Sequence, residues 1–263
     1  DPDSRGIITE DAVARALRPE TVFVSIGWAN SEIGTVQSIA KIAQVIRASN
    51  PNLTFHSDAG QAPLYLSPQV HTLGVDLLTL DSGKLYGPRG VGALFVRQGV
   101  TLKSILHGGG QERGLRPGSE NVALASGFAT AIAQVSRERT SEAKRLKKIR
   151  DDFAKEIMAH IPVIVVNGAI SHVLPHILNI SIPDIDSSEY LALALDHRGI
   201  SVSTKSACKE GEARSYVVDA LGREAWRAQN TLRFSFGRGT TESEVARARQ
   251  TLVEILSAQK RML

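Results

Sequence analysis

The sequence predicts an α/β fold for its first half and a smaller α+β region for its second half. In the first half, short runs of β-branched and apolar residues alternate with segments whose apolar residues recur at helical spacing. Such alternation is typical of a largely parallel sheet covered by helices on both faces. Polar side chains follow several of the runs, and ligands of parallel sheets bind at the carboxyl ends of strands. We therefore expect a ligand site at that edge of the sheet.

The elements of the first half follow from local patterns. Thr9 is placed to cap a helix over residues 10–17, and apolar residues at helical spacing predict a second helix over 39–48. A short helix is expected near residues 60–64. The predicted strands, which are rich in β-branched or apolar residues, cover 21–26, 53–56, 76–80 and 91–96.

The second half begins with a long helical pattern from Ser119 to about His160, with a break expected near 138–141. Strands are predicted over 163–166, 177–182, 200–203 and 231–236, and helices over 187–197 and 242–263. We therefore expect a large α/β domain over 1–125, a connecting helix over 126–160, and a small C-terminal α+β domain over 161–263.

Composition excludes several classes of protein. The chain has 263 residues and a net charge of +4, but its 31 basic and 27 acidic residues are interleaved, which argues against a nucleic-acid-binding surface. No apolar run approaches the roughly 20 residues needed to span a membrane, and the polar, acidic start predicts no signal peptide. A single cysteine excludes an internal disulfide and cannot build a thiolate zinc site, so we expect no metal and a reducing, cytoplasmic location.

Lys84 is the first candidate for catalysis. It lies in the segment DSGKLYGPRG (81–90), between two predicted strands. A lysine at the point where a buried strand breaks into a glycine-rich turn is held near low-dielectric surroundings, which lower the pKa of its ammonium. A neutral lysine amine condenses with aldehydes to form a Schiff base. This is the arrangement that a pyridoxal 5′-phosphate (PLP) enzyme needs. The alternative, which the segment alone favours, is a surface lysine in a hairpin turn.

Asp58 and Gln61 lie at the end of the predicted strand over 53–56. An aspartate there can pair with a protonated pyridine nitrogen, which keeps PLP an electron sink. Gln61 is placed to hydrogen-bond the phenolic oxygen of the cofactor. The alternative for Asp58 alone is a helix N-cap.

Taken together, Asp58-x-x-Gln61 and Lys84 resemble the fold-type I PLP enzymes, and closely the cysteine desulfurases that supply sulfur for iron–sulfur clusters. Four further stretches carry this resemblance: ANSEIGTVQ (29–37), GGGQERGLRPGS (108–119), STKSAC (203–208) and TLRFSFGR (231–238). The resemblance runs in order along the whole chain. It implies a partial large domain, because roughly the first third of the family's chain is absent from these 263 residues.

The resemblance also implies roles for individual residues. Cys208, in a polar segment with Lys205 and Lys209 beside it, becomes the thiol that takes sulfur from PLP-bound L-cysteine as a persulfide. Arg233 binds the substrate carboxylate, with a structural ion pair as its alternative. Ser119 matches a hydroxyl that reaches the PLP phosphate of a partner subunit, which implies a homodimer.

The chain departs from the family pattern at two places. The family has two asparagines before Glu32, whereas this chain has Asn30 and Ser31, so Asn30 is expected near the substrate and Ser31 at the cofactor. Asp81-Ser82-Gly83 replaces the usual Ser-x-His before the lysine. Ser82 is expected to supply the phosphate with a substitute donor. The Asp81 carboxylate would repel the phosphate unless it turns away or binds a bridging cation.

The predicted function is therefore removal of sulfur from L-cysteine to give L-alanine, with delivery to a protein acceptor such as an iron–sulfur scaffold or a tRNA-thiolation carrier. Two alternatives stay open. One is a selenocysteine lyase or another class V aminotransferase, although the polar cysteine segment disfavours an aminotransferase. The other is a non-catalytic fragment that acts as an interaction module.

Overall fold

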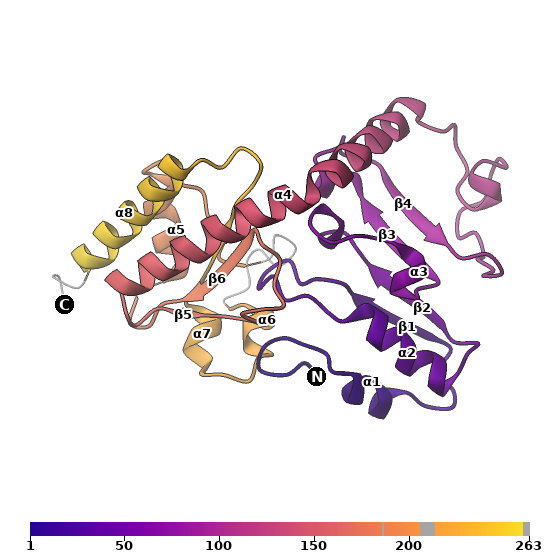
Figure 1. Ribbon diagram of the computed structural model, residues 1–263, viewed down its shortest axis with the longest axis horizontal. Helices are drawn as coiled ribbons and strands as arrows, with labels where there is room; N and C mark the ends of the chain where they lie inside the picture. The colour runs from indigo at the N-terminus through magenta and orange to yellow at the C-terminus, as the bar shows by residue number, and fades with distance from the viewer. Residues whose placement is uncertain (186, 206–213, 260–263) are drawn as a thin grey trace. The chain divides into compact units, whose positions relative to one another are not determined.

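The computed structural model describes residues 1–185, 187–205 and 214–259 (Figure 1). The chain forms two compact units. One comprises residues 13–28 and 38–139, and the other comprises residues 1–12, 29–37 and 140–263. This division differs from the expected domain boundaries, because residues 1–12 and 29–37 belong with the C-terminal half.

The first unit contains a four-stranded sheet in the order β1 (Phe23–Gly27), β2 (Thr54–Asp58), β3 (Leu77–Asp81) and β4 (Gly92–Val96). Strands β1, β2 and β3 run parallel, and β4 pairs antiparallel with β3. The expected largely parallel sheet is thus present, with one antiparallel strand at its edge.

Helix α2 (Ile39–Ser49) packs one side of this sheet. It buries Ile39, Ile42, Ala43 and Ile46, the stripe that helical spacing predicts. A single turn, α3 (Val70–Leu73), contacts α2. On β2, Phe55 and Ser57 are fully buried on this side, as expected where side chains alternate between faces.

The opposite side of the sheet is open, so the prediction of cover on both faces is wrong for the described residues. Phe23, Ser25 and Gly27 of β1 are exposed, as is Leu94 of β4, and we call this surface the open face. His56 joins Ser25 and Thr79 across it through hydrogen bonds of 2.8 Å. A largely parallel sheet with one bare face leaves apolar side chains in water.

The second unit contains an antiparallel sheet in the order β5 (Val165–Val166), β6 (Ile177–Ser181) and β7 (Thr231–Ser235). The predicted strand over 200–203 is reduced to one bridge between Ser203 and Arg233, because the segment meets β7 at a single pair. Helices α5 (Ser188–Asp196), α6 (Tyr216–Asp219), α7 (Ala225–Gln229) and α8 (Glu242–Gln259) complete the unit. Phe153 packs edge-on against Phe236 in its core.

Helix α4 (Val122–His160) is continuous over 39 residues, so the break expected near 138–141 is wrong. Its first part buries Phe128, Ala131 and Val135, and its second part belongs to the other unit. At the start of the chain, Thr9 accepts a hydrogen bond from the backbone of Ala12 and begins α1 (Glu10–Ala16), as predicted.

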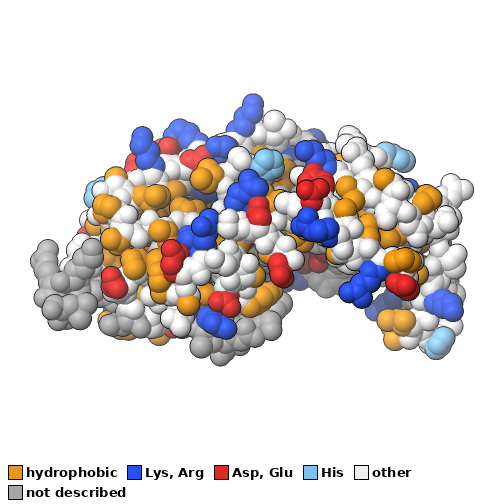
Figure 2. All heavy atoms as spheres, turned by 90° about the horizontal axis from the view of Figure 1, so that it is seen from below, with side chains coloured by type: hydrophobic (Ala, Val, Ile, Leu, Met, Phe, Trp, Pro, Cys, Tyr) orange, Lys and Arg blue, Asp and Glu red, His pale blue; other side chains and the backbone are white. Residues whose placement is uncertain are grey.

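The described surface is mixed in charge and also carries exposed apolar side chains. The face drawn in Figure 2 shows basic side chains interspersed with acidic ones. None of the described helices combines the length and apolarity that crossing a membrane requires.

Candidate functional site

Asp58 and Lys84 lie at the same edge of the first unit's sheet. Asp58 is the last residue of β2 and pairs with Thr79 of β3. Lys84 follows the end of β3 by three residues, in the single turn η2 (Ser82–Leu85). Because β2 and β3 are parallel, their carboxyl ends meet at one edge, where ligands of such sheets bind. Both residues therefore lie at the edge of the sheet where the sequence analysis expects a ligand site.

The carboxylate of Asp58 is exposed and only partly used by the protein. Its Oδ1 accepts a hydrogen bond of 2.8 Å from the backbone N–H of Gly60, which fixes its orientation. No described residue hydrogen-bonds its Oδ2. Gln61 follows at the start of η1 (Ala62–Leu64), half-buried, and its side-chain amide makes no hydrogen bond within the described residues. Both side chains can therefore accept an external partner.

The turn that carries Lys84 is closed by Asp81. The Asp81 Oδ1 accepts a hydrogen bond of 2.9 Å from the backbone of Gly83, so this carboxylate is turned into the chain. Tyr86 ends the turn in the left-handed conformation, with φ of 60°. The Lys84 side chain is exposed. The prediction of low-dielectric surroundings is thus wrong for the described residues.

Ser82, the predicted donor to the phosphate, is enclosed by the protein. It is fully buried, and its Oγ has no hydrogen-bond partner among the described residues. The Oγ packs against Gly87, where an added Cβ would lie only 2.3 Å away. The hydroxyl is therefore enclosed within the turn, and local sequence could not reveal this because it depends on how the turn folds back.

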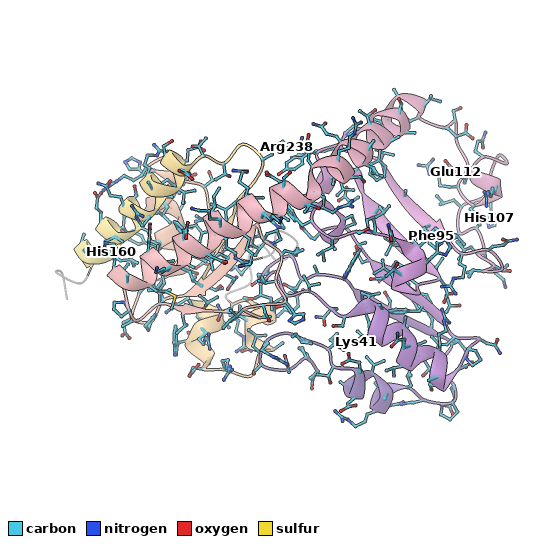
Figure 3. The ribbon with its side chains drawn as sticks, viewed as in Figure 1. Lys41, Phe95, His107, Glu112, His160 and Arg238 are labelled. Carbon is cyan, nitrogen blue, oxygen red and sulfur yellow. The ribbon has the colours of Figure 1, made fainter. Side chains whose placement is uncertain are left out.

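Ser119 lies in the exposed segment between β4 and α4. Figure 3 labels His107 and Glu112 on this segment. Glu112 and Arg113 adopt positive φ values of 48° and 59° at the turn η3 (Glu112–Gly114). Positive φ is uncommon for residues other than glycine and is enriched at functional turns. Ser119 itself is exposed.

Arg233 lies in the other unit, on β7. Its Nη1 donates a hydrogen bond of 3.0 Å to the backbone carbonyl of Ser31. Burial lowers the pKa of the Arg233 guanidinium, and the charge of Glu32 opposes that shift. Its Nε is buried without a hydrogen-bond partner in the described part of the chain. Arg233 therefore has one guanidinium donor that no described residue takes.

Asn30 and Ser31 form the turn that Arg233 contacts. The Asn30 Oδ1 accepts hydrogen bonds from the backbone of Glu32, at 2.8 Å, and of Ile33, at 3.0 Å. This oxygen is committed to the turn, so only the amide nitrogen remains for the predicted contact with substrate. The structure brings Asn30, Ser31 and Arg233 together in one unit, and Asp58, Gln61 and Lys84 together in the other.

Glu32 is the residue that sequence reasoning missed. It entered the analysis only as part of a motif, yet its side chain is 1% exposed. The signal in the sequence was an acidic residue directly before the apolar Ile33.

Cys208, the predicted sulfur acceptor, lies outside the described residues, as do the other residues of 206–213. The segment leading to them is anchored by Lys205, whose Nζ lies 2.9 Å from Glu189 Oε1 on α5. After them, Ser215 begins α6 by accepting a hydrogen bond from Val218.

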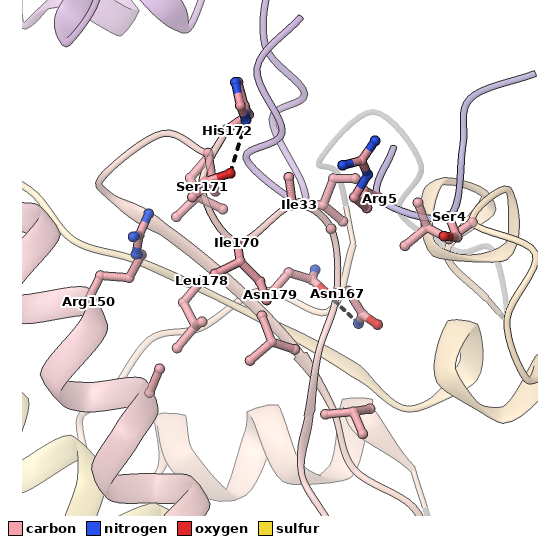
Figure 4. Close-up of a pocket in the computed structure, with 18 of the residues that line it drawn as sticks. Ser4, Arg5, Ile33, Arg150, Asn167, Ile170, Ser171, His172, Leu178 and Asn179 are labelled. Carbon is pink, nitrogen blue, oxygen red and sulfur yellow. Dashed lines mark hydrogen bonds between the residues drawn. The ribbon is translucent and has the colours of Figure 1, made fainter. Parts of the chain in front are cut away.

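A cavity of about 800 Å³ also opens in the second unit (Figure 4). Arg5, Arg150, Asn167, His172 and Asn179 are among the polar residues that line it. None of the predicted site residues that the structure describes does so, and apolar side chains make up much of the remaining wall. The cavity is therefore separate from the predicted substrate-binding residues.

The fold and the sheet-edge residues define a class of protein, the fold-type I PLP enzymes. The chain belongs to the aminotransferase class-V family, whose profile matches residues 1–248. Within this family, the relatives it resembles are cysteine desulfurases. It is 37% identical over 244 residues to the cysteine desulfurase IscS of Dictyoglomus turgidum, covering 92% of this chain and 61% of that relative.

Further comparisons agree. The cysteine desulfurase IscS 1 of Archaeoglobus fulgidus is 37% identical, with 99% of this chain and 67% of the relative covered. A solved NifS-like protein matches with a TM-score of 0.90 at 32% identity, over 97% of this chain and 67% of that one. A structure titled as SspA in complex with cysteine matches with a TM-score of 0.72 at 30% identity, over 89% and 64%. The chain thus spans about two thirds of the length of these relatives.

PLP is the cofactor of this family, and the donors in the first unit suit its ring. Asp58 offers an unpaired carboxylate oxygen, Gln61 an unpaired amide and Lys84 an exposed amine at the same edge. Fewer donors are available for the phosphate of PLP, because the hydroxyl of Ser82 is enclosed and Asp81 carries a negative charge. The described residues therefore fit the ring of PLP better than its phosphate.

Proposed function

We propose that this chain acts as a cysteine desulfurase, which converts L-cysteine to L-alanine and a protein-bound persulfide. The observation that carries the proposal is the placement of Asp58 and Lys84 after neighbouring parallel strands, each with an atom available to a ligand. The names of the relatives support the substrate, since they are cysteine desulfurases and one related structure contains cysteine.

The residues of the first unit would hold PLP. Lys84 would attach it covalently through Nζ, and Asp58 would hold a proton at the pyridine nitrogen. Gln61 would contact the phenolic oxygen, and Ser119, from a partner subunit in a homodimer, would contact the phosphate. When bound, PLP supplies the electron sink that allows the C–S bond of cysteine to break.

The residues of the second unit would hold the substrate and take its sulfur. Arg233 would bind the carboxylate, with the amide nitrogen of Asn30 beside it. The Cys208 thiolate attacks the sulfur of L-cysteine, so that an S–S bond forms as the C–S bond breaks. The electron pair left on carbon takes up a proton, for which Lys84 is the donor. The products are L-alanine and a Cys208 persulfide, and the reaction needs no oxidant.

The persulfide would pass its sulfur to a protein that assembles iron–sulfur clusters or thiolates tRNA.

A Cys208→Ala variant tests the proposal. We expect it to retain PLP and bind L-cysteine but to release almost no sulfide, because covalent attachment needs Lys84 whereas sulfur transfer needs a thiolate. The measurement is sulfide and alanine release from the PLP-loaded protein, with mass spectrometry of Cys208 in the unaltered enzyme. Turnover that continues in the variant would refute a persulfide on Cys208.

A further inference from the structure

The cavity of about 800 Å³ takes no part in the proposed reaction (Figure 4). All of the residues that line it belong to the second unit. Its volume lies within the range of about 300–1,000 Å³ that is typical of small-molecule sites, so it has room for a ligand of modest size. The chemistry of its walls and rim therefore indicates the class of ligand that it takes.

Apolar side chains form much of the wall. Val165 and Val166 of β5 line the cavity, together with Ala154 and Met158 of α4 and Ile7 near the start of the chain. Each of these residues is half-buried or exposed, so a molecule in the cavity reaches it. Because burial of apolar surface is favourable, such walls favour a ligand with an apolar body.

The polar groups at the floor are used within the protein. Asn167, which follows β5, donates from its Nδ2 to Asn179 Oδ1 at 2.7 Å and to Ser181 Oγ at 2.6 Å (Figure 4). Asn167 and Asn179 are buried, and their remaining amide atoms are buried with them. These side chains therefore close the floor and do not bind a ligand, which leaves the recognition of a polar group to the rim.

The charge around the cavity is positive. Among the described residues that line it are four arginines and one acid, Asp151. The carboxylate of Asp151 is already paired with two cations, since its Oδ1 accepts a hydrogen bond of 2.9 Å from Arg150 Nε and its Oδ2 pairs with Lys147. Little negative charge is therefore left to repel an anion.

Arg223 is the lining arginine that is open to a ligand. It is exposed, and it makes no hydrogen bond or ion pair with another described residue. By contrast, Arg5 is paired with Asp3 at 2.7 Å, and Arg227 donates from Nη2 to the backbone carbonyl of Val166 at 3.0 Å. An accessible cation thus lies beside an apolar cavity.

We propose that this cavity binds a small amphipathic anion, a carboxylate with an apolar chain or ring. Its apolar body lies against the walls, and its head group is bound at the rim by Arg223. The planar fork of one guanidinium matches one carboxylate with two hydrogen bonds. The site is separate from the proposed PLP reaction, because none of the described residues assigned to that reaction lines it.

Octanoate is the probe, and the cavity contains a natural reporter. The chain has two methionines, of which Met158 lines the cavity. In protein labelled with ¹³C at the methionine methyl groups, octanoate should shift the NMR signal of Met158 in a saturable way, and Met158→Leu assigns that signal. Butyrate, which has the same head group and four fewer methylenes, should bind more than about tenfold more weakly, because it buries less apolar surface.

The charge of the head group is tested with octan-1-ol and Arg223→Gln. The variant should bind octanoate about fivefold more weakly, as expected for an exposed ion pair, and should bind octan-1-ol as the unaltered chain does. Arg198→Gln is the matched control, because Arg198 lies in the same unit but pairs with Glu254 and does not line the cavity. It should leave the binding of both ligands unchanged.

The location is tested by filling the cavity. Ala154→Phe places a large side chain on the wall and should abolish the response to octanoate, whereas Ala154→Ser, which keeps the side chain small, should retain it. Circular dichroism of each variant checks that the fold is kept.

Four outcomes would overturn the proposal. They are no saturable shift in the unaltered chain, octan-1-ol binding as tightly as octanoate, an effect of Arg223→Gln no larger than that of Arg198→Gln, and an octanoate response that persists in folded Ala154→Phe. The titration is repeated on a protein extended by the part of the relatives that this chain does not span. Loss of the Met158 response there would show that polypeptide, and not a small anion, occupies the cavity.

Discussion

The guanidinium of Arg233 donates a 3.0 Å hydrogen bond to the carbonyl of Ser31, which lies 202 positions earlier in the chain. This contact attaches β7 to the turn that opens the ANSEIGTVQ motif, so two motifs from opposite ends of the sequence form one structure. The guanidinium keeps its Nε unpaired in the described part of the chain. The proposed function assigns this guanidinium to the carboxylate of the substrate.

Replacing Arg233 with lysine should therefore weaken substrate binding. A lysine ammonium keeps the charge but loses the planar fork that meets a carboxylate with two hydrogen bonds. We expect the KM for L-cysteine to rise roughly 10- to 100-fold, as loss of a buried charge-assisted contact implies. Steady-state kinetics of the PLP-loaded protein provide the measurement. A KM within twofold of the unaltered value would assign Arg233 a structural role only.

Lys84 should be the residue that carries PLP. We expect Lys84→Ala to lose the visible absorption band of the bound cofactor in a complete protein, because that band requires covalent attachment to an amine. Borohydride reduction followed by peptide mapping should place the pyridoxyl group on Lys84. Lys103→Ala serves as the control and should keep the band. A label on Lys103, or on any other lysine, would contradict the assignment.

The 263-residue chain by itself should bind PLP weakly. Few described residues are placed to donate a hydrogen bond to the phosphate, since the hydroxyl of Ser82 is enclosed. Each missing charge-assisted hydrogen bond weakens binding by about 1.5–3 kcal/mol, so two or three lower the affinity by roughly two to five powers of ten. Titration followed by absorbance measures this. Adding the part of the relatives that this chain does not span, fused or separate, should restore the band. A monomeric, PLP-saturated and active chain would refute this account.

The open face should also make the isolated chain prone to aggregate. Phe23 is 50% exposed on it, at the free edge of β1, and an exposed apolar edge strand pairs readily with other chains. We expect Phe23→Ser to reduce aggregation, measured by light scattering, without loss of helix content. The contrast is Phe55→Ser on the enclosed face, which should cost about 3–5 kcal/mol of stability. Unchanged scattering in Phe23→Ser would show that aggregation arises elsewhere.

Stability at acid pH should depend in part on Glu189. Burial raises the pKa of this carboxyl, but the hydrogen bond and charge of Lys205 outweigh it, so the pKa lies below the ordinary value of 4.5. Because the pKa of Glu189 is lower in the folded state than in the unfolded state, the pair stabilises the fold at pH values above the pKa of the unfolded state. This stabilisation is lost as the pH falls through the pKa of the folded state. Because Glu189 is half-exposed, the effect is a fraction of 1 kcal/mol.

The check is urea unfolding of Lys205→Met between about pH 3 and pH 7. The variant should differ from the unaltered chain at neutral pH and converge with it at acid pH. A constant difference across this range would show that Lys205 acts through packing and not through its charge.

Local sequence pattern was enough to predict much of the fold. The apolar stripe of Ile39, Ile42 and Ile46 predicted α2, because apolar residues at helical spacing form the face of the helix that is buried. The runs of β-branched and apolar residues predicted β1 to β3. The segment over 200–203 failed as a strand, since its pairing depends on where β7 lies and not on its own composition.

For the candidate site, the sequence by itself determined which residue types follow which strands. That placed Asp58 and Lys84 at one edge, because parallel strands must end together. Only the tertiary structure decided that Lys84 is exposed, that the hydroxyl of Ser82 is enclosed against Gly87, and that the buried Glu32 lies within reach of Arg233's charge. The physical reason is that burial and electrostatic environment depend on contacts between distant segments, and no local pattern encodes them.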